Sequence, residues 1–128
     1  MSDFVLKIWN YFWIFLLVIW KNTDYNVGNG YNIIDGKFTA PVDGIYSFYT
    51  QAESLTSKNS NVAFYINGSH KSNTYRNKEG EHDTLTLSSQ FKLNKGDTVW
   101  VYFTGYFFNP RSASYTFFEG HLIRKINS

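Results

Sequence analysis

The chain has 128 residues, which is enough for one domain with a hydrophobic core and too few for two comfortable ones. Aromatic residues make up 20% of it, charged residues 17%, and the formal net charge is +2. Because the lysines and arginines are scattered and no basic stripe forms, we expect no nucleic-acid partner. The absence of cysteine excludes disulfides and thiolate metal sites.

An apolar segment stands near the N-terminus. Residues 8–20, IWNYFWIFLLVIW, are short for a transmembrane helix, which needs about 20 such residues. They have the length of a signal-peptide core, although Asp3 spoils a basic leader and no small-residue cleavage site follows. They also suit a buried first strand. We interpret residues 1–20 as a first strand or a signal-peptide-like segment, not a membrane anchor, and residues 21–128 as the globular domain.

Short strands separated by turn residues follow Trp20. Asn67-Gly68 is the strongest hairpin signal, because both turn residues tolerate positive φ. A second turn is predicted at residues 94–97, and no helical period of apolar residues is visible beyond the N-terminus. The predicted strands span residues 37–40, 45–52, 62–66, 69–75, 84–93, 98–108 and 115–126. Strands at this spacing favour an all-β, antiparallel sandwich or barrel.

The strand at 98–108 is apolar on both faces. Val99, Val101 and Phe103 point to one side of it. Trp100 and Tyr102 point to the other, whereas an antiparallel sandwich in water normally keeps one face polar. A chain this short has little left to cover the second face, so we expect self-association that buries Trp100 and Tyr102.

A spaced pattern of aromatic, asparagine and glycine residues gives the chain a family resemblance. The pattern W-x5-N-x4-Y-x6-F-x5-G-x-Y-x-F is formed by Trp20, Asn26, Tyr31, Phe38, Gly44, Tyr46 and Phe48. Together with FTAP at 38–41, FKLNKGDTVWV at 91–101 and FFEGHLI at 117–123, which includes Phe118 and Gly120, it resembles the globular-head domain of complement C1q. Two positions depart from that pattern: the family prefers Phe at Trp20 and an aromatic residue at Thr50.

The resemblance implies a jelly-roll sandwich of about ten strands, shared with the tumour-necrosis-factor cytokines and assembled as a trimer, with the first strand beside the last. The signature residues would then be structural. Phe38, Tyr46 and Phe48 would each contribute about 1.5–3 kcal/mol by burial, and Gly44 would relieve a steric constraint beside Asp43.

Enzyme chemistry finds no support in the sequence. The histidines at 70, 82 and 121 are isolated, and neither G-x-S-x-G nor G-x4-G-K-[ST] occurs. We therefore expect no catalytic site.

Three carboxylates gather in one loop, at Glu79, Glu81 and Asp83. Calcium takes about six to eight oxygen ligands, so these groups with backbone carbonyls and water would suffice for a site. Some members of the resembled family bind calcium near this part of the domain. The alternative is an acidic loop that is only solvated, and no other cofactor is expected.

Further candidate sites lie in turns and loops. Asn67 begins the glycosylation sequon Asn67-Gly68-Ser69, although the same pair is needed for the hairpin turn. Tyr106 and Arg111 bracket a loop whose rings suit protein or sugar contacts, unless Phe107 and Phe108 cap the sandwich end. Lys71, Arg76 and Arg111 are the cations expected to contact an anionic ligand.

The sequence thus predicts a non-enzymatic, secreted recognition module of the innate-immune pattern-recognition type. Its homotrimers would bind extracellular protein, glycan or anionic surface ligands, and trimerisation would turn weak contacts into avidity. The alternatives are a cytokine-like receptor ligand on the same fold, a structural trimerisation domain, and, with least support, a carbohydrate-active enzyme.

Overall fold

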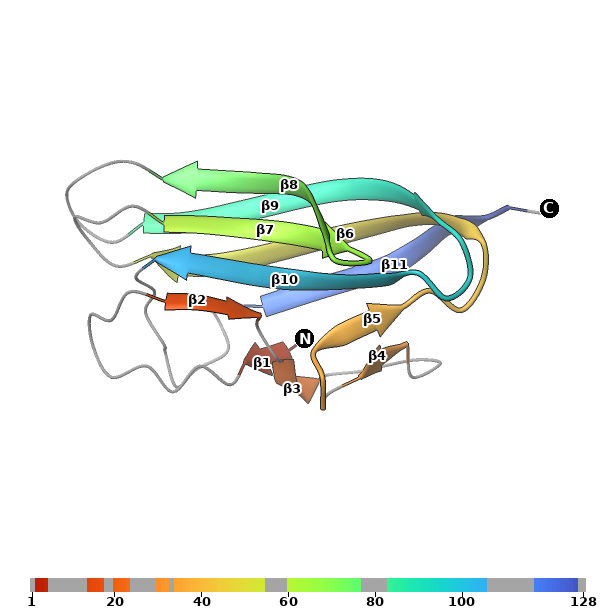
Figure 1. The fold of residues 1–128 in the computed structure, drawn as a ribbon, viewed down its shortest axis with the longest axis horizontal. Helices are drawn as coiled ribbons and strands as arrows, with labels where there is room; N and C mark the ends of the chain where they lie inside the picture. The colour runs from red at the N-terminus through yellow and green to blue at the C-terminus, as the bar shows by residue number, and fades with distance from the viewer. Residues whose placement is uncertain are drawn as a thin grey trace.

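The computed structural model describes residues 2–4, 14–17, 20–23, 30–32, 34–54, 60–76, 83–105 and 117–126. Within these ranges every regular element is a strand (Figure 1). The strands are β1 (Ser2–Phe4), β2 (Ile14–Leu17), β3 (Trp20–Thr23), β4 (Tyr31–Asn32), β5 (Lys37–Thr39), β6 (Gly44–Ser54), β7 (Ser60–Ile66), β8 (Ser69–Arg76), β9 (Asp83–Leu93), β10 (Thr98–Gly105) and β11 (Phe117–Lys125).

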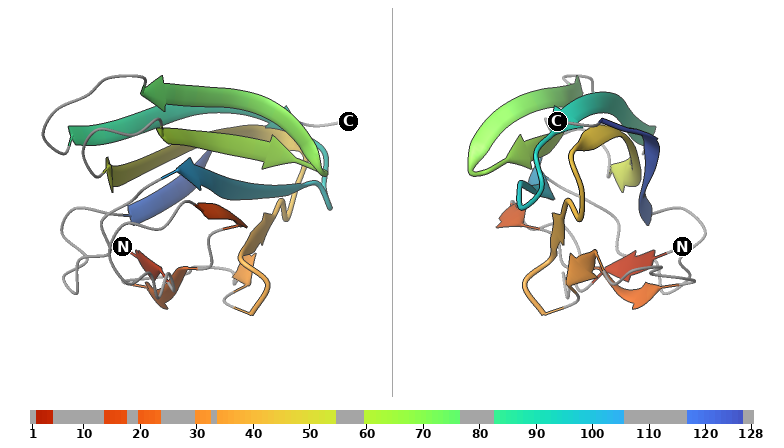
Figure 2. Two further views of the ribbon diagram at one scale, coloured as in Figure 1. Left: turned by 60° about the vertical axis from the view of Figure 1, so that its left-hand side comes forward. Right: turned by 90° about the vertical axis from the view of Figure 1, so that its right-hand side faces the viewer.

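Two antiparallel sheets pack face to face. One has the strand order β11-β6-β9, and the other has the order β4-β5-β10-β7-β8 with β2 also paired to β10. The end-on view of Figure 2 shows the two layers, with the small β1–β3 sheet set apart from them. The predicted fold class, an all-β antiparallel sandwich of jelly-roll type, is confirmed.

The first strand contacts the last, as the resemblance implies, because β1 lies against β11, but the ladders of the N-terminal strands form with other partners. Strand β1 pairs with β3, and β2 pairs with β10 from Tyr102↔Leu17 to Gly105↔Ile14. The physical reason lies in β10, because β5 pairs only with its Thr98 and Val99. The backbone groups farther along that edge need other partners, and β2 supplies them.

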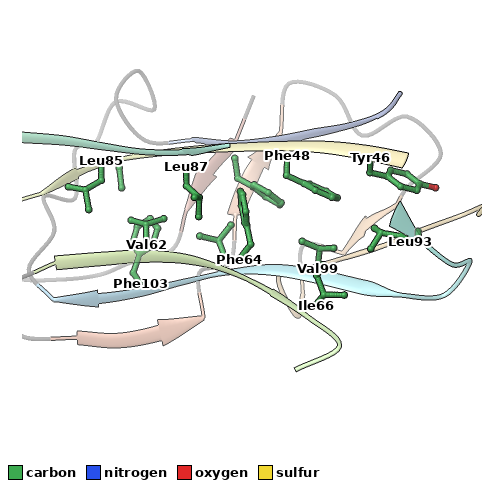
Figure 3. Close-up of a cluster of buried hydrophobic side chains, with 14 residues drawn as sticks. Tyr46, Phe48, Val62, Phe64, Ile66, Leu85, Leu87, Leu93, Val99 and Phe103 are labelled. Carbon is green, nitrogen blue, oxygen red and sulfur yellow. The ribbon is translucent and has the colours of Figure 1, made fainter. Parts of the chain in front are cut away.

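The core follows from strand alternation. Side chains of β6 and β9 point toward those of β7 and β10 across the space between the sheets, as Figure 3 shows. Val99, Val101 and Phe103 are 0% exposed, which confirms the predicted inner face of β10. At the centre lies Phe48, whose ring centroid is 5.4 Å from that of Phe38 and 5.9 Å from that of Phe118.

Two signature glycines admit neighbouring groups. A Cβ at Gly44 would lie 2.8 Å from the Arg124 carbonyl oxygen and 2.6 Å from Leu122 Cδ1. The close approach of β11 therefore constrains position 44. A Cβ at Gly120 would lie 2.6 Å from Phe48 Cδ1, so this glycine makes room for the central ring.

Of the other signature residues, those whose side chains the structure describes lie in or against the core. Tyr46 and Phe118 are buried, and Tyr31 and Phe38 pack against the core from its border. Trp20 begins β3, and nothing is described of its side chain. Asn26 lies outside the described residues.

Candidate functional site

The outer face of the larger sheet carries a cluster of aromatic side chains. Alternation along β10 turns Trp100 and Tyr102 outward, and strand pairing sets Tyr65 of β7 opposite Trp100 and His70 of β8 opposite Tyr65. Lys37 of β5 joins them through its contact with Trp100. We call these five residues the outer aromatic face.

The rings form a row across the strands. The Tyr65 and Trp100 centroids are 5.9 Å apart with planes only 11° from parallel, and the His70 ring meets Tyr65 nearly at right angles, at 5.5 Å. Beyond the indole, Lys37 Nζ lies 4.6 Å from the centroid of the Trp100 ring, within the range of a cation–π interaction. Because β7 and β5 flank β10 on opposite sides, Tyr65 and Lys37 approach the indole from opposite sides.

A small residue, Ala63, lies beneath the rings of the outer aromatic face. Ala63 of β7 pairs with Tyr102, and its strand position turns it outward. It is nevertheless only 1% exposed. Above it the Tyr65 and Tyr102 rings pack with centroids 5.4 Å apart. The outer aromatic face is therefore a packed layer, and a larger residue at position 63 would displace its rings.

The face is only partly covered by the chain itself. Tyr65, Trp100 and Tyr102 are half-buried, since their neighbours on the same sheet cover much of each ring. Within the described ranges, neither the two tyrosine hydroxyls nor the indole N–H has a hydrogen-bond partner. Apolar rings with open polar tips are typical of residues at protein interfaces.

Of the other predicted ligand and metal residues, the structure describes the side chain of Lys71 alone. Lys71 is exposed on β8, at the register irregularity that follows His70. Arg76 ends β8 and Asp83 begins β9, and nothing is described of their side chains. Tyr106, Arg111, Glu79 and Glu81 lie outside the described residues.

The part of the chain that the structure describes holds neither a metal-binding cluster nor a membrane-spanning helix. There, no group of three or more histidine, aspartate or glutamate side chains is placed to hold a metal ion. In the same part, no helix is long and apolar enough to cross a membrane.

Three members of the outer aromatic face were not singled out from the sequence. A two-residue turn at Asn67-Gly68 fixes the hairpin register, so the opposition of Tyr65 and His70 could have been derived from it. Lys37 and Trp100 lie on strands far apart in sequence, and no local pattern indicates their contact.

Comparison with known proteins places the chain in a family. A model of the C1q domain matches residues 13–123. Complement C1q tumor necrosis factor-related protein 2 is 32% identical over 103 residues in both Mus musculus and Homo sapiens. The match covers 77% of this chain and 34% and 35% of those proteins, so the chain spans about a third of their length. Multimerin-2 of Homo sapiens is 31% identical over 105 residues, which are 81% of this chain and 11% of that protein.

Solved structures share the fold. The globular domain of zebrafish complement 1qA protein superposes with a TM-score of 0.67 at 19% identity, with 86% of each chain covered. Murine APRIL superposes with a TM-score of 0.63 at 19% identity, with 87% of this chain and 89% of that one covered. At 19% identity these superpositions show a shared fold alone. The family assignment rests on the sequence matches. The chain belongs to the C1q domain family.

Proposed function

We propose that this C1q domain is a non-enzymatic recognition module whose copies assemble as a homotrimer and bind extracellular protein or glycan ligands. Membership of the C1q domain family supports the module and the trimer that the sequence resemblance implies. The observation that carries the proposal is the outer aromatic face, with its packed rings and open polar tips. Three identical sites on one assembly would convert weak single contacts into avidity.

In this proposal the outer aromatic face is the surface that meets sister copies. Its rings are already ordered by contacts within one chain, so little side-chain entropy remains to be lost on association. Tyrosine and tryptophan side chains of this kind are enriched among the residues that dominate interface energies. Trp100 and Tyr102 would be central because β10 lies between β5 and β7 in the sheet.

The ligand contacts are a separate part of the proposal. Exposed Lys71 supports an anionic group on the ligand, with Arg76, Tyr106 and Arg111 as further contacts. Calcium at Glu79, Glu81 and Asp83 and secretion of the chain are further proposals. A glycan on Asn67 is the alternative to the free amide, whose Nδ2 donates to Asp97 in this structure.

The assembly can be tested by replacing both outward aromatics of β10. Because their side chains lie outside the core, the double variant Trp100→Ser/Tyr102→Ser should keep its fold by circular dichroism. We expect light scattering to give three chains per particle for the wild type and one for the double variant. Ile123→Ser is the matched control, since Ile123 is 47% exposed on the other sheet. A double variant that stays trimeric, or a control that dissociates, would contradict the assignment of the surface.

The proposed recognition role is tested with the same three proteins in a binding assay. Wild type, double variant and control are passed over immobilised sulfated and neutral glycans and over immobilised extracellular matrix protein. If avidity carries recognition, the wild type and the control are retained on at least one surface and the monomeric double variant elutes early. Elution of the wild type from every surface, while it remains trimeric, would favour a structural trimerisation domain instead.

A further inference from the structure

The hairpin turn between β7 and β8 is held by one side chain. Asn67 has a φ of 50° and Gly68 a φ of 86°, the left-handed pair that a tight hairpin requires. Asn67 Oδ1 accepts hydrogen bonds from the Thr98 backbone N–H, at 2.9 Å, and from Thr98 Oγ1, at 3.2 Å. Its Nδ2 donates to Asp97 Oδ1 at 3.0 Å. The amide of Asn67 thus ties this turn to the turn between β9 and β10.

Both carboxylate oxygens of Asp97 accept hydrogen bonds from these two turns. Asp97 Oδ2 accepts the Asn94 backbone N–H at 2.8 Å, while Oδ1 accepts Asn67 Nδ2. Backbone hydrogen bonds add to the link, since Asn67 N–H donates to the Thr98 carbonyl oxygen at 3.0 Å. We call the Asn67, Asp97 and Thr98 side-chain contacts the turn strut.

An Asn-Gly pair has a characteristic chemistry of its own. Because glycine has no side chain, the backbone nitrogen of Gly68 can reach Cγ of Asn67. A bond forms between the two atoms, and Nδ2 leaves as ammonia. Water then opens the resulting succinimide at either carbonyl, to give aspartate or isoaspartate. The net change replaces an amide by a carboxylate, with one water consumed and one ammonia released.

The turn strut opposes this reaction in the folded chain. The leaving atom Nδ2 is the one that donates to Asp97, and the two hydrogen bonds to Oδ1 fix the orientation of Cγ. We propose that Asn67 is a deamidation site that folding protects, and that its conversion irreversibly removes the contact between Asn67 and Asp97 from the turn strut. One oxygen of the product carboxylate can still accept from Thr98, but the other replaces Nδ2 and faces Asp97 Oδ1, where the donor is lost and two like charges repel. The inference does not depend on self-association.

Deamidation is measured by mass spectrometry of the peptide that contains Asn67, after incubation at neutral pH well below Tm. We expect the folded wild type to react several-fold more slowly than the chain unfolded in urea, and Asp97→Ala to approach the unfolded rate. Asp43→Ala is the matched control: Asp43 Oδ1 accepts the Lys95 backbone N–H at 2.7 Å and so supports the same end of the sandwich through a hydrogen bond that does not involve Asn67. Equal folded and unfolded rates, or equal acceleration by Asp43→Ala, would overturn the proposal.

A swap of the two side chains tests the consequence of the modification. Asn67→Asp should lower Tm, and adding Asp97→Asn should restore most of the loss, because the carboxylate and the amide exchange places and the hydrogen bond re-forms with the donor on residue 97. No loss in Asn67→Asp, or no recovery in the pair, would be contrary to the strut. The same peptide map reports a glycan on Nδ2 of secreted protein, and its presence would also overturn the proposal, since that atom would then be blocked.

Discussion

Tyr46 serves the core and a neighbouring bend with the same side chain. Its ring is 1% exposed and meets Phe38 edge-on at 5.6 Å. Its hydroxyl donates to the Val42 carbonyl oxygen at 2.8 Å and lies 3.3 Å from the Val42 nitrogen, which donates to it. The bend that leads into β6 is therefore fixed to the strand that follows it.

Removal of this hydroxyl should be costly. We expect Tyr46→Phe to lower the free energy of unfolding by about 1–3 kcal/mol, because two backbone groups of Val42 lose a partner in a part-buried place. Tyr49→Phe is the comparison, since the Tyr49 hydroxyl donates to Gln51 Oε1 at 3.0 Å on the outer side of the same strand, and its loss should be smaller. Urea denaturation of both variants measures the difference. Equal losses, or none in Tyr46→Phe, would disagree with this role.

At the scale of elements, side-chain hydrogen bonds connect an edge strand of one sheet to an edge strand of the other. Strands β8 and β9 are edge strands of different sheets within the described topology. Thr74 Oγ1 donates to the Thr86 carbonyl oxygen at 2.6 Å, and the Ser72 and Ser89 hydroxyls lie 2.9 Å apart. These bonds join the two edges where no strand ladder connects them.

Thr74→Val keeps the shape of the side chain and removes its hydroxyl donor. We expect a loss of about 1 kcal/mol in the free energy of unfolding, together with faster hydrogen exchange along β8. Thr104→Val on β10 is the control, because Thr104 is also half-buried and its hydroxyl has no partner among the described residues. If both variants lose the same stability, the hydrogen bond from Thr74 to Thr86 does not stabilise the contact between β8 and β9.

Local patterns predicted these elements well. Alternation placed Leu85 and Leu87 inside and Thr84 and Thr86 outside, as the structure shows, because a strand must turn successive side chains to opposite faces. The Asn67-Gly68 turn was also correct, since few residue pairs tolerate its two positive φ angles.

Contacts between distant strands could not be predicted in this way. The pairing of β2 with β10, the steric role of Gly44 against β11 and the Thr74 bond to β9 depend on which edges meet in space. The same limit applied to the candidate site. Trp100 and Tyr102 were visible as outward aromatics of an apolar strand, but the Lys37 contact that covers one side of the indole was not.

At the scale of the whole molecule, β10 links the core to the proposed assembly. One face of this strand is fully buried between the sheets, and the other carries Trp100 and Tyr102 in the outer aromatic face. Because Tyr65 and Lys37 already cover the ring surfaces, a sister copy would contact mainly ring edges and polar tips. Association would then depend on hydrogen bonds from these tips as well as on apolar burial.

The central claim is that self-association buries Trp100 and Tyr102. Hydroxyl-radical footprinting read by mass spectrometry tests it most directly, because this method reports the solvent accessibility of individual side chains. The protein is labelled at a concentration where light scattering shows single chains and again where it shows the assembly. We predict that Trp100 and Tyr102 are protected several-fold in the assembly, while Tyr75, which is 55% exposed near the far end of β8, reacts equally in both. Equal labelling of Trp100 in both states, with protection appearing instead around Ile123 on the other sheet, would contradict the account.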